Sequence, residues 1–117
     1  MAEFLLLFRG GFNADDRAAL SPEQMQANMQ KWNAWMGGLA KEGKMLGAQP
    51  LQAAGKTVRG KSKAIVDGPF AEGKEVIGGY LLCKADTIEE ATEIGKGCPI
   101  LEHDNGSVEV RAVDPRM

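Results

Sequence analysis

Cysteine and histidine are scarce in this sequence, and the scarcity excludes several kinds of site. The 117 residues include two cysteines, Cys83 and Cys98, and one histidine, His103. Two cysteines without a CxxC spacing indicate neither a disulfide framework nor a zinc site, and a lone histidine lacks the further ligands that a metal needs. The sequence also lacks a P-loop and a dinucleotide-binding fingerprint. We therefore expect buried, reduced thiols, no metal and no cofactor.

A strong charge of one sign and a long apolar run are also missing. The net charge is −2 and the isoelectric point about 5.4, so no overall field attracts nucleic acid or an anionic membrane. The apolar run Phe4–Phe8 is too short to span a bilayer, and Glu3 precedes it where a signal peptide carries positive charge. We expect a cytoplasmic protein that has neither nucleic acid nor membrane as a partner. A chain of this length fits one domain, residues 1–117.

What the chain does have is a well-marked series of strands and helices. The run Phe4–Phe8 is apolar throughout, which predicts a central strand buried on both faces. Ser21-Pro22-Glu23-Gln24 combines an N-cap hydroxyl, a proline at the first helical position and a capping-box glutamine, and predicts a helix that ends near Gly43. Apolar residues at spacings of four and three predict a core-facing stripe on this helix: Met25, Met29, Trp32, Met36 and Leu39.

The second half of the chain continues this alternation. Pro50 in the apolar segment Met45–Leu51 indicates an edge strand. A buried strand is predicted at Tyr80–Cys83, a second helix after the capping residues Asp86–Glu89, and a half-buried strand at Ser107–Val113. We therefore predict an α+β fold of the ferredoxin-like βαββαβ type, with an antiparallel sheet and an extra or broken strand in the middle.

Two helices can cover only one face of such a sheet. Alternate residues of the apolar strands are then left without cover on the other face. A symmetric homodimer, with sheet face against sheet face, would cover them, and we expect this dimer.

A basic segment precedes the most unusual part of the chain. Lys56, Arg59, Lys61 and Lys63 could hold an anion, but no aromatic residues interleave with them, which favours a solvated hairpin. The segment Asp67–Tyr80 follows. It begins with a sharp change of direction, because a glycine that accepts positive φ is followed by a proline that fixes its own φ. We interpret it as a corner that joins two core strands.

Several motifs together resemble one known family. They are Asp67-Gly68-Pro69-Phe70, Gly78-Gly79-Tyr80, Cys98-Pro99-Ile100 and Ser107-Val108-Glu109-Val110-Arg111. In combination they resemble the YCII-related family in its DGPF-domain branch, and the similarity spans nearly the whole chain. The resemblance implies a ferredoxin-like fold that assembles as a dimeric α/β barrel with a cleft beside the sheet. The family has no established reaction.

The resemblance also bears on catalysis and on partners. Shorter relatives have a proposed His and Asp pair associated with the first helix, which suits general acid–base chemistry. This chain has neither residue between Pro22 and Glu42, so the pair does not carry over and it is left open whether the protein is an enzyme. Some family members have genes beside those of extracytoplasmic-function sigma factors, which suggests a partner in sigma-factor regulation.

Asp67 and His103 are the candidate catalytic residues. Asp67 ends an apolar strand at a rigid turn, where it either serves as an acid or base or caps the turn, which is the commoner role. His103 has a side chain that ordinarily titrates near neutrality, although a polar, glycine-containing loop favours a solvated imidazole. Further residues are candidates for ligand binding if they converge on one cleft: Arg9, Phe70, Lys74, Glu75 and Tyr80. Arg9 could alternatively pair with Asp67.

Three functions fit these observations. A homodimeric small-molecule-binding or regulatory module is favoured, because the His and Asp pair is missing. A cofactor-independent enzyme of the dimeric α/β-barrel kind would use Asp67 or His103 as acid or base, with Arg9 or Lys74 holding an anionic substrate. A partner-binding role in sigma-factor regulation rests on the resemblance alone.

Overall fold

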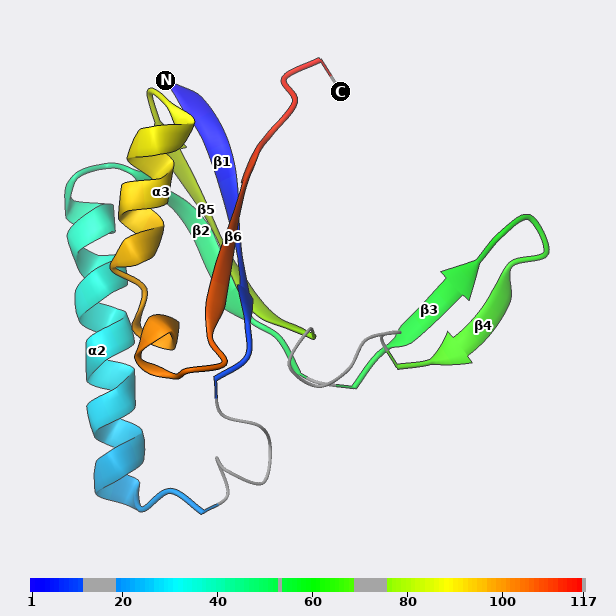
Figure 1. The fold of residues 1–117 in the computed structure, drawn as a ribbon, viewed down its shortest axis with the longest axis horizontal. Coiled ribbons are helices and arrows are strands. Elements are labelled where there is room, and N and C mark those ends of the chain that lie inside the picture. Colours follow the sequence, from blue (N-terminus) through cyan, green and yellow to red (C-terminus); the bar gives the residue numbers. More distant parts are fainter. Residues whose placement is uncertain (12–18, 53, 69–75, 117) are drawn as a thin grey trace.

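The main sheet carries α2 (Pro22–Lys41) and α3 (Ile88–Lys96) on one side (Figure 1). The computed structural model describes residues 1–11, 19–52, 54–68 and 76–116. The strands, in spatial order, are β2 (Met45–Pro50), β5 (Ile77–Ala85), β1 (Ala2–Arg9) and β6 (Ser107–Ala112). The described residues also form the short 3-10 helix η2 (Pro99–Glu102).

The strand order and connections are those of a ferredoxin-like fold. β1 pairs with β5 on one side and with β6 on the other, and all neighbouring strands run antiparallel. α2 lies between β1 and β2 in the chain, and α3 lies between β5 and β6. The predicted α+β, ferredoxin-like architecture is therefore confirmed, with β1 in the middle of the sheet and β2 at its edge as expected.

Burial alternates along the central strands. Phe4, Leu6 and Phe8 are buried, whereas the residues between them are only half-buried. Because successive strand residues point to opposite faces, the half-buried residues lie on the side away from α2 and α3. We name this side the open face, and its apolar residues are Leu5, Leu7, Tyr80 and Leu82. The prediction that the first strand is buried on both faces is thus wrong for the single chain.

The sequence signals at the ends of α2 form the expected caps. Ser21 Oγ accepts a hydrogen bond from Gln24 N at 3.1 Å, and Gln24 Oε1 accepts one from Ser21 N at 2.9 Å. These bonds satisfy amide groups that the first turn of a helix leaves without partners. After the C-cap residue Glu42, Gly43 adopts φ +72°, a conformation that favours glycine and ends the helix.

Only part of the predicted stripe on α2 reaches the core. Trp32, Met36 and Leu39 belong to the core or pack against it, but Met25 and Met29 are 43% and 57% exposed. Figure 1 shows the reason, since the first turns of α2 extend beyond the end of the sheet. The continuous core stripe is therefore corrected: helical spacing fixes which residues share a face, but not how far the surface behind that face extends.

Aromatic rings and free thiols occupy the core on the covered side of the sheet. Phe8, Trp32 and Trp35 make edge-to-face contacts, with ring centroids 5.4 Å apart for the nearest pair. Cys83 and Cys98 are buried and unpaired with each other, as expected. Burial raises the pKa of Cys98 from 9.0 to about 11 and also raises the pKa of Cys83, so both thiols are neutral near pH 7.

Between β2 and β5 the chain forms a separate hairpin, which we name the arm. It consists of β3 (Lys56–Arg59) and β4 (Ala64–Asp67), which pair antiparallel. Figure 1 shows the arm projecting from the body, on the side of the sheet away from the helices. The Cα radius of gyration of 15.7 Å accordingly exceeds the value of about 13 Å for a compact chain of this length.

The arm confirms one expectation and overturns another. Its four basic residues are exposed at the surface of a hairpin, as the absence of interleaved aromatics predicts. The segment Asp67–Tyr80, however, does not join two core strands. Its first residue ends β4, which belongs to the arm, and only its last residues belong to the main sheet. An apolar triplet such as Ala64-Ile65-Val66 has strand propensity in either place, so its composition does not distinguish a core strand from a projecting one.

Candidate functional site

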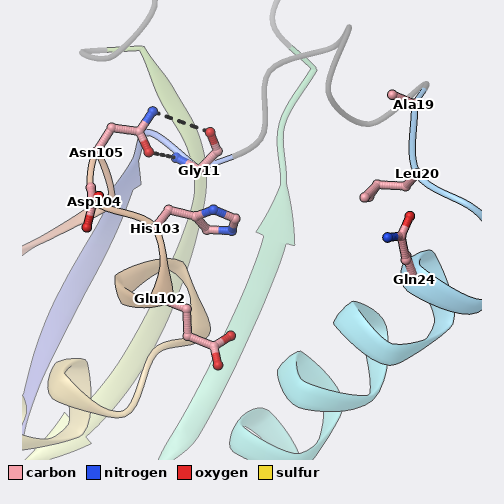
Figure 2. Close-up of a pocket in the computed structure, with 8 residues that line it drawn as sticks. All are labelled: Gly11, Ala19, Leu20, Gln24, Glu102, His103, Asp104 and Asn105. Atoms are coloured by element: carbon pink, nitrogen blue, oxygen red, sulfur yellow. Dashed lines mark hydrogen bonds between the residues drawn. The ribbon is translucent and has the colours of Figure 1, made fainter.

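An open cleft lies between the loop after η2 and the start of α2 (Figure 2). Its volume is about 720 Å³, within the range of about 300–1,000 Å³ that is typical of small-molecule sites. One wall is formed by Glu102, His103, Asp104, Asn105 and Gly11, and the other by Ala19, Leu20 and Gln24. At the cleft, the end of β1 and the beginning of α2 therefore lie close to a loop near the C-terminus.

A side-chain clamp fixes the first wall. Asn105 Oδ1 accepts a hydrogen bond from Gly11 N at 3.1 Å, and Asn105 Nδ2 donates one to Gly11 O at 3.4 Å. The side-chain amide thus bonds both backbone groups of one residue, much as a neighbouring strand would. These residues are 94 positions apart in the sequence. The end of β1 consequently holds the loop that carries His103.

Glycines allow the backbone to pass closely at this clamp. Gly10 has φ +82°, in the left-handed region that favours glycine, and a Cβ there would collide with the backbone O of Asn105. A Cβ on Gly106 would collide in the same way with the backbone O of Ile100. The His103 loop is therefore packed against β1 on one side and η2 on the other, with no room for a side chain at either position.

His103 directs its imidazole into the cleft (Figure 2). The residue is half-buried, its N donates a hydrogen bond to Ile100 O at 3.2 Å, and its O accepts one from Gly106 N at 2.9 Å. The loop histidine that the sequence favours as a solvated side chain thus forms part of a cleft wall. From this position an imidazole can exchange hydrogen bonds or a proton with a molecule in the cleft.

An ion pair joins η2 to α2 beside the cleft. Lys31 Nζ donates hydrogen bonds to both carboxylate oxygens of Glu102, each at 3.2 Å. A smaller hollow of about 440 Å³ lies nearby and is lined in part by Lys31, Glu102 and Cys98. Because burial raises the pKa of Cys98 to about 11, its thiol stays protonated and is a poor nucleophile near neutral pH.

Comparison with known families identifies the family of the chain. Its residues 12–116 match the YCII-related domain. The chain belongs to the YCII-related family. The resemblance seen in the DGPF and GGY motifs is therefore confirmed at the level of the family.

One solved structure similar to this YCII-related protein is a 5-chloro-2-hydroxyhydroquinone dehydrochlorinase from Burkholderia phenoliruptrix, in complex with 2,5-dihydroxybenzoquinone. The two chains share 16% sequence identity with a TM-score of 0.47, over 96% of this chain and 93% of that chain. Comparison with curated proteins gives no match.

The structure places the first candidate residue of this YCII-related protein outside the cleft. Asp67 ends β4 in the arm, where its side chain is 89% exposed and pairs with Lys56 at 2.7 Å. It is not among the residues that line the His103 cleft. Three ligand-binding candidates, Phe70, Lys74 and Glu75, lie outside the described residues.

Arg9 and Tyr80 lie on the main sheet. Arg9 Nη1 donates a hydrogen bond to Glu109 Oε1 at 2.7 Å, so the ion pair considered with Asp67 is made with Glu109. Arg111 Nη1 also donates to this carboxylate, at 3.2 Å. Hydrogen bonds from Arg111 and then Arg9 hold the pKa of Glu109 below its ordinary value of 4.5. Tyr80 lies opposite Leu7 in the strand register, on the open face.

Sequence reasoning missed several residues that form the cleft. Gln24 has a sufficient explanation as a capping residue, and Asn105 has one as a turn residue, so neither suggests a site by itself. The available signal is the pair of glycines at positions 10 and 11 together with Asn105-Gly106, because each pair indicates an unusual backbone. Nothing in the sequence shows that these two distant segments meet.

The cleft offers an imidazole, carboxylates and amides. Among residues 1–11, 19–52, 54–68 and 76–116, no group of three or more His, Cys, Asp or Glu side chains could hold a metal ion. None of the helices in the described part of the chain is long and apolar enough to cross a membrane. The side chains that line the cleft can supply hydrogen bonds and take part in proton transfer.

Proposed function

We propose that this YCII-related protein binds a small polar molecule in the His103 cleft. The observation that carries the proposal is the convergence of His103, Gln24 and Glu102 on a hollow of about 720 Å³. The wall that holds His103 is fixed by the Asn105 clamp, and Leu20 adds an apolar contact opposite. A few fixed polar groups in a preformed hollow are the general pattern of small-molecule sites. Imidazole, amide and carboxylate groups favour a ligand with hydroxyl, amide or amino groups.

A ligand screen read by the melting temperature tests this proposal, because a molecule that binds only the folded state raises that temperature. Hits are expected to bind about fivefold more weakly to His103→Gln, since one hydrogen bond is worth roughly 1 kcal/mol. Lys41→Gln, on the exposed last turn of α2, is the matched control and should bind as the wild type does. Equal affinity for all three proteins would place the ligand elsewhere and contradict the proposal.

The single histidine supplies a second measurement. Because the chain contains one imidazole, its carbon-bound proton resonances are unique in an NMR spectrum. A ligand in the cleft should shift them, while a ligand bound at the arm or on the open face should leave them unchanged. This measurement locates a hit without any substitution.

Acid–base catalysis by His103 is a second candidate, favoured by the direction of its imidazole into the cleft. A catalytic acid or base must lie within hydrogen-bond reach of the bound molecule. Asp67, the other acid or base considered from the sequence, lies in the arm and has no part in this candidate. If a ligand is found to be turned over, His103→Gln should abolish turnover while Asp67→Asn should not. Full turnover by the His103 variant would exclude this mechanism.

We also infer a homodimer formed through the open face. Leu5, Leu7, Tyr80 and Leu82 belong to the two central strands, yet they are only half-buried. A second copy placed sheet against sheet would bury them in the symmetric manner of most soluble oligomers. Sedimentation at micromolar concentration is expected to give twice the chain mass of 12.6 kDa. A clean monomer would contradict the dimer.

A further inference from the structure

Neither the packing of the main sheet nor the proposed ligand binding in the cleft accounts for the arm. In the described part of the chain, β3 and β4 pair with each other and with no other strand. A two-stranded hairpin alone is marginally stable at best in water, and a third strand or a packed helix is usually needed. We therefore expect the arm to gain stability by packing against another surface.

An apolar pair on the arm is available for such a contact. Val58 and Ile65 lie directly opposite each other in the register, and they are 63% and 67% exposed. Opposite side chains on one face of an antiparallel pair lie close enough to form a single surface. The neighbouring pair, Thr57 and Val66, points to the other face and is half-buried. The arm thus presents its more exposed apolar side to whatever lies beside it.

The charge of the arm is opposite to that of the rest of the chain. Residues 56–67 contain four basic side chains and one acidic side chain, a net charge of +3. Because the whole chain carries −2, the remainder carries −5. Opposite charges on two parts of one chain attract the arm of one copy to the body of another.

The position of the arm suits a second copy. Figure 1 shows that the arm projects on the side of the main sheet away from the helices, which is the side of the open face. A copy packed against the open face would therefore lie next to the arm, and by symmetry its own arm would lie next to the first copy. The same rotation that covers the open face brings each arm alongside its partner.

We propose that the arm of each copy clasps the second copy, with Val58 and Ile65 packed against the partner and the basic tip facing its acidic surface. The clasp rests on the homodimer proposed above, since it needs a partner on the open-face side. It adds a second contact region, formed by a segment that the main sheet does not contain. The occupant is a second copy of this chain, because the charge of the body complements that of the arm and the arm projects toward that copy.

Substitutions within the arm test the clasp. Val58→Thr combined with Ile65→Thr keeps β-branched side chains, and therefore strand propensity, while reducing the apolar surface. The double variant is expected to raise the dimer dissociation constant by about tenfold or more, given the loss of apolar burial at two sites. Ile88→Thr is the matched control, because Ile88 is also an exposed β-branched residue but lies at the start of α3, on the covered side of the sheet. Its dimerisation should be unchanged.

Charge on the tip is tested separately. Lys61→Gln combined with Lys63→Asn removes two charges, and asparagine tolerates the left-handed conformation that Lys63 adopts at φ +57°. This variant should dimerise more weakly than the wild type at low salt, and the difference should fall as salt screens the attraction. A difference that does not respond to salt would remove the electrostatic part of the proposal.

Cross-linking identifies the partner directly. A zero-length reagent joins lysine amines to carboxylates, and mixing isotopically light and heavy copies separates links within a copy from links between copies. Links between copies from Lys61 or Lys63 support the clasp. Links within one copy only, or arm lysines protected by added nucleic acid or anionic vesicles without any link between copies, overturn it.

Different results would contradict the clasp and the open-face dimer. A wild-type monomer at micromolar concentration overturns both. A wild-type dimer whose dissociation constant is unchanged by Val58→Thr with Ile65→Thr overturns the clasp alone and leaves the open-face dimer standing. A weakened dimer together with links between copies from the arm lysines supports both.

Discussion

The two faces of the main sheet differ in cover more than in composition. On the covered face, Phe4, Leu6 and Phe8 are buried beneath the helices. On the open face, Leu5 and Leu7 come from the same strand and are as apolar, yet they stay half-buried. An apolar run therefore predicts a shielded strand, but in the single chain the helices shield one face of this strand and leave the other half-buried.

The surroundings of the two faces differ as well. No buried polar or charged residue lies among the core residues that the structure describes. On the open face, by contrast, the leucines are bordered by the ion pairs of Arg9, Glu109 and Arg111. An apolar centre with a charged rim is the usual composition of a protein interface. The covered face is thus part of a finished core, whereas the open face has the composition of an interface, and four experiments test this difference.

The largest effect is expected from truncating neighbouring leucines on the two faces. Leu6 is fully buried, so Leu6→Ala should lower the free energy of unfolding by about 2–5 kcal/mol through lost burial and a residual cavity. Leu5→Ala should lower it by roughly 1 kcal/mol in the isolated chain, because its side chain is already partly hydrated. Urea titration at low protein concentration measures both. Equal losses would mean that one chain covers both faces alike, which would contradict the difference in cover between the two faces.

A charge on the open face should act on assembly more than on folding. Leu82→Lys would place an ammonium group in the proposed interface and should weaken dimerisation by about a hundredfold or more, since an unpaired charge is costly to bury. The folded chain itself should tolerate the change, because the lysine stem can lie on the sheet with its charge in water. Met29→Lys, on an exposed part of α2, is the control. Dimerisation measured by sedimentation should be unaffected by the control and weakened by this factor in the test variant.

Local signals in the sequence predict the fold well. The capping residues Ser21 and Gln24 make the bonds expected of them, and Pro50 ends an edge strand as its missing N–H requires. The ferredoxin-like class of the fold follows from the alternation of strands and helices along the chain. These features depend on neighbours in the sequence, so composition and spacing are enough to predict them.

The sequence predicts the candidate site poorly, because the site depends on distant contacts. The bonds between Asn105 and Gly11 set the wall of the cleft, and no local pattern indicates that these residues meet. Asp67 is prominent in the sequence because of the turn predicted after it, yet Asp67 itself ends β4 of the arm. His103 is the candidate that lines the cleft, and the loop that carries it is fixed from two sides. Backbone demands and functional demands both select glycine and polar residues, and a sequence alone does not separate them.

A smaller effect is expected at alkaline pH, from a thiol on the covered side. Burial raises the pKa of Cys98 from 9.0 to about 11, which corresponds to about 2–3 kcal/mol between the neutral and ionised forms. Because the folded-state pKa is the higher one, this stability is present in full below pH 9 and is lost as the pH rises toward 11. Cys98→Ala removes this titration, so the wild type should lose more stability than the variant over this range in urea titrations. Parallel pH profiles would contradict the burial of the thiol.

The smallest effect is expected at acidic pH, from the rim of the open face. Hydrogen bonds from Arg111 and Arg9 lower the pKa of Glu109 below 4.5 in the folded protein. The folded-state pKa is the lower one, so the associated stability is present above pH 4.5 and is lost as the pH falls through the folded-state value. Exposed pairs of this kind contribute little, and salt should reduce the contribution further. Melting temperatures of the wild type and Glu109→Gln, compared at pH 7 and below pH 4.5, should therefore converge on acidification.

The same acid titration can be read for assembly as well as folding. If the open face is buried against a second copy, the ion pairs at its rim are shielded from solvent, and charge pairs interact more strongly there than at an exposed surface. The convergence of the wild type and Glu109→Gln should then be larger at protein concentrations that favour the dimer than at high dilution. If the difference does not depend on protein concentration, Glu109 stabilises the folded single chain only. The charged residues beside the open face would then no longer support an interface.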